Sequence, residues 1–246
     1  LHFARRSSVA LSRAARSFEP HWSRRESISW RHARRSSAVT ARGYHRGVTH
    51  GAIVLCGGLS TRMGRAKALL PWRGRTLIEH VVGILREVVN EVVVVASAEL
   101  ELPALEAKLV RDREPKRGPL AGIREGLEAI TSDFAFVTST DAPFLAAPFV
   151  KAMLSFGVTA APDVGGFVQS MSAVYAKTLA RAANELIVSG RLRPLFLLEA
   201  GNFRRVRADE LPDLDSMKSL NTPEEYLEAL KRDGQTGGAT VEFLGT

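Results

Sequence analysis

Short apolar runs alternate with stretches of helical periodicity over most of the chain. Residues 52–55, 92–95 and 134–138 are runs of apolar and β-branched side chains, and residues 92–95 are four consecutive valines. Runs of this length without polar alternation are typical of strands buried on both faces of a sheet. A Gly pair follows the first run, which indicates that this strand enters a turn.

Four other stretches carry apolar side chains at helical spacing, and we predict helices near residues 77–85, 120–130, 148–154 and 179–187. Thr76 with Glu79 fits a capping box at the start of the first helix. Thr222 with Glu225 fits a second capping box, and Pro223 would stand at the first helical position. We therefore expect a further helix to begin there.

The alternation of strands with helices predicts an α/β fold, a three-layer sandwich around a mostly parallel sheet. In such sheets the ligand crevice lies beyond the carboxyl ends of the strands. The Gly pair after residue 55 and Asp141 after the third strand both fall at that edge. The candidate chemistry therefore gathers at one edge of the predicted sheet.

The positive charge of the chain is concentrated near its beginning. The 246 residues carry a net charge of +8. Residues 1–50 hold eleven Arg and two Glu, a net charge of +9, whereas the remainder holds 23 Lys and Arg against 24 Asp and Glu, a net charge of −1. Because the body is nearly neutral, we expect no nucleic-acid partner for it.

Composition also divides the chain into three parts. Residues 1–48 are rich in Arg and Ser without apolar periodicity, so we expect disorder. This leader is open to three interpretations: a targeting segment, a basic arm for anionic surfaces, or a stretch outside the natural mature protein. Residues 49–231 form the predicted domain, and residues 232–246 begin with a linker. Residues 239–246 resemble the opening strand of a β-grasp domain, so they are either the start of a truncated fused domain or only an edge strand.

The one cysteine, Cys56, excludes a disulfide framework and a zinc site built from thiols. A reducing compartment, the cytoplasm, is the simplest expectation. The sequence has no run of about 18 apolar residues, so we expect no transmembrane helix.

The segment after the first strand is the strongest candidate for phosphate binding. Residues 55–64 read LCGGLSTRMG, and Lys67 follows. Gly57 and Gly58 let the backbone approach a phosphate or a base, and successive N–H groups can form an anion-binding concavity. Arg62 and Lys67 add positive charge that suits a triphosphate and the charge that develops in phosphoryl transfer. The alternative is an ordinary strand–turn–helix connection with a basic surface.

The spacing of this loop excludes two large classes of nucleotide-binding protein. Five residues separate Gly58 from Gly64, and no Lys-Ser or Lys-Thr pair follows, so the loop is not a Walker loop. The loop also lacks the G-x-G-x-x-G pattern of dinucleotide-binding proteins.

Asp141 directly follows a buried strand, and a carboxylate facing a triphosphate is a natural Mg²⁺ ligand. The alternative is a capped turn. Asp112 can accept hydrogen bonds from a base or ribose, or it is a solvated loop charge. Asn221 can bind Mg²⁺ or an acceptor phosphate, or it is a polar turn residue. We expect His80 to be structural and Cys56 to be an inert thiol.

Four ordered motifs resemble the molybdenum cofactor guanylyltransferases over about residues 49–231. They are the loop at 55–67, GPLAG at 118–122, TDAPFL at 140–145 and NTPEE at 221–225. The resemblance implies a Rossmann-like nucleotidyltransferase domain that joins GMP from GTP to molybdopterin-bound molybdenum and releases pyrophosphate. It also implies in-line attack by an acceptor phosphate oxygen on the α-phosphorus, without a covalent enzyme intermediate.

The resemblance also implies the role of each site residue. Backbone atoms of Leu55, Cys56, Gly57 and Gly58 would contact the nucleotide, and Asp112 would contact the nucleoside. Arg62, Lys67 and Asp141 would be catalytic, with Asp141 as the Mg²⁺ ligand. Asn221 would lie on the acceptor side. The implied partners are GTP, molybdopterin and other proteins of cofactor biosynthesis, with no membrane.

The chain departs from the family pattern at three places, and three other functions compete: a cytidylyltransferase, another small nucleotidyltransferase and a noncatalytic adaptor. Cys56 replaces the usual Ala, residues 96–98 lack an Asn that contacts the nucleotide, and Ser219 replaces a second Asn. The related cytidylyltransferases use CTP and typically have Ala where this chain has Gly57, so the Gly pair favours GTP. From another class, the chain could be a noncatalytic nucleotide-binding adaptor in a cofactor-biosynthesis fusion, an alternative that an intact Asp141 disfavours.

Overall fold

The computed structural model describes residues 47–57, 66–114 and 117–235. Their central sheet has the strand order β10-β7-β9-β6-β1-β4-β5, with β8 paired to β7. The strands are β1 (His50–Cys56), β4 (Glu91–Ala96), β5 (Lys108–Arg111), β6 (Phe134–Ser139), β7 (Ala160–Val164), β8 (Phe167–Val168), β9 (Ala173–Ala176) and β10 (Arg204–Arg207). A separate hairpin pairs β2 (Pro71–Trp72) with β3 (Arg75–Thr76).

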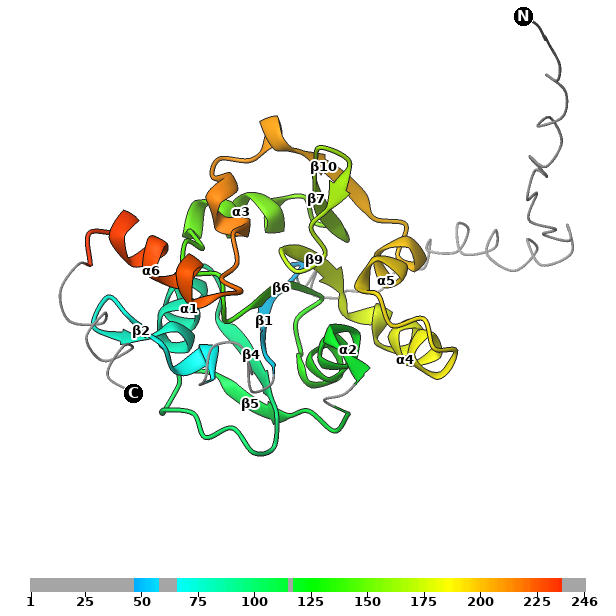
Figure 1. The fold of residues 1–246 in the computed structure, drawn as a ribbon. Helices are drawn as coiled ribbons and strands as arrows, with labels where there is room; N and C mark the ends of the chain where they lie inside the picture. The colour runs from blue at the N-terminus through cyan, green and yellow to red at the C-terminus, as the bar shows by residue number, and fades with distance from the viewer. Residues whose placement is uncertain (1–46, 58–65, 115–116, 236–246) are drawn as a thin grey trace, which may run out of the picture. The chain divides into compact units, whose positions relative to one another are not determined.

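Helices cover both faces of the sheet (Figure 1). One face carries α1 (Leu77–Arg86) and α3 (Ala147–Ser155), and the other carries α2 (Pro119–Ala129), α4 (Ala180–Val188) and α5 (Pro194–Ala200). The last helix, α6 (Pro223–Arg232), packs against the β2–β3 hairpin, where the Tyr226 hydroxyl donates to the Pro71 carbonyl at 2.6 Å. The predicted three-layer α/β sandwich is confirmed.

The strand runs predicted from sequence form the middle of the core. Along β1, Ala52 and Val54 pack toward α1 and α3, whereas Ile53 and Leu55 pack toward α2. All four are buried, as expected for a strand covered on both faces. Burial on both sides explains why these runs carry no polar alternation.

The pairing directions bring the ends of four strands to one edge. β1 lies between β4 and β6 and is parallel to both, and β4 is also parallel to β5. Only the far half of the described sheet contains antiparallel pairs, in which β9 runs against β6 and β7, and β8 runs against β7. The carboxyl ends of β1, β4, β5 and β6 therefore meet, and the loops after them can share a site.

The first predicted helix cap is confirmed and the second is half confirmed. Thr76 accepts a hydrogen bond from the Glu79 N–H, while the Glu79 carboxylate accepts from the Thr76 N–H at 2.7 Å. Thr222 likewise caps α6 by accepting from the Glu225 N–H at 3.2 Å. The return bond of this second box was predicted wrongly, because the Glu225 carboxylate accepts from the N–H of Asn221, one residue earlier.

Several predictions fall on residues outside the described ranges. These are the leader over residues 1–46, Gly58 and Arg62, and the possible β-grasp strand over residues 239–246. At the carboxyl end, Asp233 and Gln235 still contact Arg73 of the hairpin turn. None of the helices described here is long and apolar enough to cross a membrane.

Candidate active site

A cavity of about 400 Å³ lies at the carboxyl edge of the sheet, directly beyond β1. Side chains from or after β1, β4, β5 and β6 line it, together with the start of α2. The structure brings six of the predicted site residues together here: Leu55, Cys56, Gly57, Lys67, Asp112 and Asp141. Residues far apart in the sequence thus share one site because parallel strands end at the same edge.

Lys67 connects three segments of the chain. It lies at the start of a 3₁₀ turn, Lys67–Leu69. Its ammonium donates to Asp141 Oδ2 at 2.9 Å, to Asn221 Oδ1 at 3.3 Å and to the carbonyl of Leu220. These partners lie up to 154 positions away, so Lys67 holds the loop after β6 and the segment before α6 beside the cavity.

Asp141 is held from both sides. Its Oδ1 accepts a hydrogen bond from the Ser139 hydroxyl, and its Oδ2 accepts from Lys67. The carbonyl of Asp141 also accepts from the Leu220 N–H at 2.9 Å. The side chains of Asp141 and Lys67 are each 18% exposed, so their charges reach solvent and can meet a charged ligand.

The side chains around Asp141 determine which metal ion could bind there. The described residues contain no group of three or more His, Cys, Asp or Glu side chains that could hold a metal ion. A structural zinc site needs such a group, whereas Mg²⁺ is usually held by one or two carboxylates with substrate phosphates and waters. Asp141 beside a cavity fits the second pattern, and the Mg²⁺ site stays a prediction.

Asp112 follows β5 and faces the same cavity. Its N–H donates to the Ala96 carbonyl at 2.8 Å and continues the β4–β5 pairing. Its Oδ1 accepts from the Glu114 N–H at 2.8 Å, an Asx turn. The turn therefore orients the Asp112 carboxylate at the cavity, and its contact with a nucleoside stays a prediction.

A second cavity of about 410 Å³ adjoins the first at Asp141. The two cavities share Pro119, Ser139, Asp141 and Met171, and the second is also lined by Gln169, Ser170, Ser172 and Ser219. Asn221 lines neither cavity, but its amide donates to Ser219 Oγ at 3.3 Å. Asp141 thus lines both cavities.

The family model of the MobA-like NTP transferase domain matches residues 52–214. A protein of Mycobacterium tuberculosis named "Probable molybdenum cofactor guanylyltransferase" is 34% identical over 183 residues, which cover 70% of this chain and 91% of that protein. The chain belongs to the MobA-like NTP transferase family. A Bacillus cereus protein with the same name as the M. tuberculosis relative is 29% identical over 194 residues, 74% of this chain and 96% of that protein.

Solved structures show the same fold. The molybdopterin-guanine dinucleotide biosynthesis protein A of Archaeoglobus fulgidus matches with a TM-score of 0.64 and 22% identity, over 76% of this chain and all of that chain. The 2-C-methyl-D-erythritol 4-phosphate cytidylyltransferase of Thermus thermophilus matches with a TM-score of 0.58 and 20% identity, over 74% of this chain and 98% of that chain. This MobA-like transferase therefore has an α/β nucleotidyltransferase fold.

Several lining residues of this MobA-like transferase were not predicted as site residues. Gly118 caps α2 with φ 73° and ψ −170°, a conformation that is essentially restricted to glycine. Gly118 and Pro119 place the start of α2 at the first cavity. The sequence signal was present, because both residues belong to the GPLAG motif. Ser139 and Met171 carried no signal, since neither residue type marks a site by itself.

The two residues expected to play no chemical part are both buried in the MobA-like domain. Burial raises the pKa of the Cys56 thiol to about 12, so the thiol stays protonated at neutral pH. His80 is 3% exposed, and its Nε2 lies 3.0 Å from the Pro143 carbonyl, to which it must donate. Burial, followed by the charges of Arg73 and Arg75, lowers the pKa of His80. The structural role predicted for His80 is confirmed.

Proposed function

We propose that this nucleotidyltransferase transfers GMP from GTP to molybdopterin-bound molybdenum and releases pyrophosphate. The observation that carries the proposal is the place of Asp141, which lines both cavities and pairs with Lys67 in the first. The relatives named for guanylyl transfer support the same activity. The reaction would take place in the cytoplasm, where a lone free thiol such as Cys56 stays reduced.

The first cavity would hold GTP. Asp112 marks the nucleoside end and Lys67 with Asp141 marks the phosphate end. The second cavity would hold the acceptor, because its hydroxyl and amide groups from Gln169 and the neighbouring serines suit a polar phosphorylated ligand. Ser219, which contacts Asn221, belongs to this acceptor side.

The transfer would be a direct displacement. A phosphate oxygen of the acceptor attacks the α-phosphorus of GTP, the new O–P bond forms, and the bond to the β-phosphate breaks as pyrophosphate leaves. Lys67 would offset the negative charge that grows on the leaving phosphates. Asp141 would hold Mg²⁺, which supplies further neutralisation of the phosphate charge when bound. Holding the two substrates in line for the attack would provide the rest of the rate acceleration.

The contacts of Lys67 suit a role in binding the phosphates of GTP. Its ammonium already has three oxygen acceptors in the protein. A phosphate oxygen is the same kind of acceptor, so it can replace the Leu220 carbonyl or Asn221 Oδ1 without leaving the charge of Lys67 unpaired.

The test is a pyrophosphate-release assay with Mg²⁺ and molybdopterin-bound molybdenum, comparing GTP with CTP. We expect GTP to be the better substrate. A preference for CTP would replace the guanylyl assignment with a cytidylyl one. Binding of GTP without release of pyrophosphate would favour the noncatalytic adaptor.

Gly57→Ala sharpens this assay. A Cβ built at Gly57 meets no atom of the described residues within 4 Å, so we expect the variant to fold as the unchanged protein does. Because Gly57 lines the nucleotide cavity, the added methyl group should lower kcat/KM for GTP and narrow its advantage over CTP. An unchanged GTP to CTP ratio would show that Gly57 does not set the base preference.

A further inference from the structure

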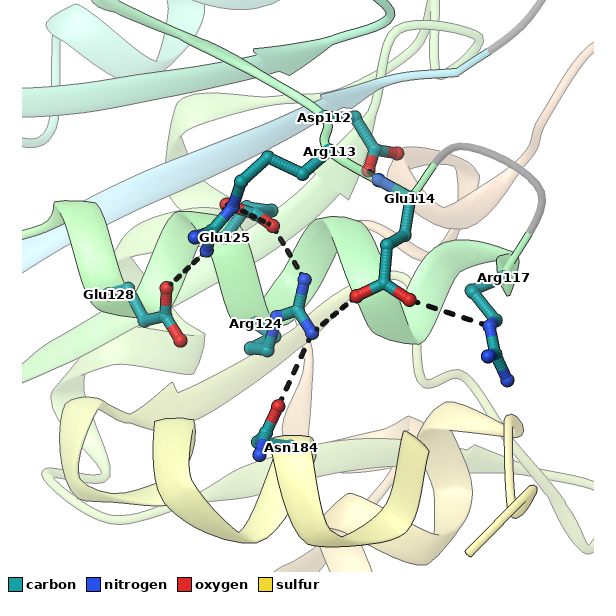
Figure 2. A network of polar contacts seen from close by, with 8 residues as sticks. All are labelled: Asp112, Arg113, Glu114, Arg117, Arg124, Glu125, Glu128 and Asn184. Carbon is teal, nitrogen blue, oxygen red and sulfur yellow. Dashed lines mark hydrogen bonds and ion pairs between the residues drawn. The ribbon is translucent and has the colours of Figure 1, made fainter. Parts of the chain in front are cut away.

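A network of charged side chains lies behind Asp112 and joins the loop after β5 to α2 and α4 (Figure 2). We call it the α2 charge network. Its members are Arg113, Glu114, Arg117, Arg124, Glu125, Glu128 and Asn184. None of these side chains was identified as a candidate from the sequence.

The centre of the network is a buried ion pair. Arg124 Nη2 donates to Glu125 Oε1 at 2.6 Å, and the two side chains are only 6% and 4% exposed. Burial acts to raise the pKa of Glu125, but hydrogen bonds from Arg113 and Arg124 outweigh it and hold the pKa below its ordinary value. Glu125 therefore stays ionised at neutral pH. A buried charged pair is costly to desolvate, so its other contacts matter.

The outward contact of this pair is Glu114. Arg124 Nη1 donates to Glu114 Oε1 at 2.8 Å, and it lies 3.4 Å from Asn184 Oδ1 on α4. Glu114 is half-buried, and its other carboxylate oxygen lies 3.4 Å from Arg117 Nε. The loop after β5 is thus tied by one side chain to a guanidinium that two helices hold in place.

Glu114 is also the residue whose backbone orients Asp112. The Glu114 N–H donates to Asp112 Oδ1, while Asp112 Oδ2 has no protein hydrogen bond among the described contacts. One oxygen of Asp112 is therefore fixed and the other can accept from a ligand. Figure 2 shows this chain of contacts running from Asp112 through Glu114 to Arg124.

We propose that Glu114 is a positioning residue for the nucleoside, which acts by anchoring the Asp112 turn to Arg124. The proposal rests on the proposed function, because it takes the first cavity as the nucleotide site. A carboxylate held in its binding orientation before the ligand arrives loses less conformational freedom on binding, so anchoring it raises affinity. Glu114 touches no substrate in this arrangement and works through Asp112.

The experiment measures GTP and CTP binding to the full chain with Mg²⁺ by calorimetry, together with the kinetics of pyrophosphate release. Glu114→Ala should raise Kd and KM for the preferred nucleotide about tenfold, with kcat within about twofold of the unchanged protein. Glu114→Gln keeps an oxygen that can accept from Arg124, so it should recover most of the affinity. Because Arg124 keeps Glu125 as a partner in both variants, the melting temperature should fall only modestly, and less for Glu114→Gln than for Glu114→Ala.

Two controls make the role specific. Glu128 pairs with Arg113 on the outer side of the network, and Glu128→Ala should leave nucleotide affinity unchanged. Inorganic pyrophosphate engages only the phosphate end, so Glu114→Ala should bind it as the unchanged protein does. A merely structural role of Glu114 would weaken the binding of nucleotide and pyrophosphate together.

The outcomes for the two proposals are separable. A Glu114→Ala variant that binds its preferred nucleotide as tightly as the unchanged protein overturns the positioning role. If Glu114→Ala loses the same factor of affinity for the nucleotide and for pyrophosphate, the positioning role is overturned as well. If the unchanged protein binds CTP more tightly than GTP, the guanylyl assignment is overturned but the role of Glu114 is not. The Glu114 variants are then compared by their affinity for CTP.

Discussion

The two ends of the nucleotide cavity are built in different ways. At the phosphate end, Lys67 and Asp141 come from loops 74 positions apart, and a single ion pair joins side chains that are each 18% exposed. At the nucleoside end, Asp112 is supported by the α2 charge network, whose central side chains, Arg124 and Glu125, are almost fully buried. The charged side chains of the phosphate end are partly exposed to solvent, whereas the nucleoside end rests on a buried ion pair, Arg124–Glu125.

This difference predicts different kinetic effects. Charges that reach the cavity can stabilise the charge that develops during transfer, so their loss should lower kcat. Buried charges that hold a loop in place act on binding, so their loss should raise KM. The two ends can therefore be separated by substitutions at single positions.

The largest expected effect is that of Asp141→Ala at the phosphate end. We expect turnover to fall on the order of 10³-fold, because the variant loses the carboxylate that faces both cavities. Lys67 keeps the Leu220 carbonyl and Asn221 Oδ1 as acceptors, so the variant should still fold. Pyrophosphate release and a thermal melt of the same preparation measure the two effects.

Ser139→Ala is the matched control for Asp141→Ala. It removes a hydrogen bond to Asp141 and keeps the carboxylate. We expect a loss of turnover about tenfold or less. If Asp141→Ala were no worse than Ser139→Ala, Asp141 would not be the charged group that drives the transfer.

A smaller effect is expected from Gly126→Ala, which disturbs the support of the nucleoside end. A Cβ built at Gly126 comes within 2.5 Å of Ile53 Cγ2, so α2 must shift away from β1. Overpacking of this kind costs about 1–3 kcal/mol. Denaturant unfolding should show that loss, and KM for GTP should rise because α2 carries Arg124.

Gly57→Ala is the comparison for Gly126→Ala, since a Cβ at Gly57 meets no atom within 4 Å in the part of the chain that the structure describes. Its unfolding midpoint should match that of the unchanged protein. If both substitutions lowered the free energy of unfolding equally, the close contact of Gly126 with Ile53 would not be what makes Gly126→Ala destabilising.

The sequence predicted the part of the fold that hydrophobic periodicity encodes. β1, β4 and β6 were visible because both faces of each strand are buried, so nearly every position is apolar. The outer strands β5 and β10 were not predicted. In β5 no residue is fully buried, and in β10 only Val206 is, so neither carries a recognisable period.

The candidate site was predictable where a residue follows a strand. Asp141 and the loop after β1 stand at the sheet edge, and their residue types suit phosphate chemistry. The α2 charge network was not predictable, because Arg and Glu on a helix usually read as a solvated face. Only the packing of α2 against β1 and α4 shows that Arg124 and Glu125 are buried.

The smallest expected effect concerns the support of the phosphate end by His80. The His80 ring donates to the carbonyl of Pro143, two residues after Asp141, and its pKa in the folded protein is lowered. Below about pH 6.5, His80 is protonated in the unfolded chain but stays neutral in the folded protein. The free energy of unfolding therefore falls as the pH drops through this range. His80→Gln keeps an N–H donor for Pro143 but does not titrate. Between about pH 7.5 and pH 5.5, the melting temperature of the unchanged protein should therefore fall further than that of His80→Gln, and equal falls would show that His80 does not contribute to the pH dependence of stability.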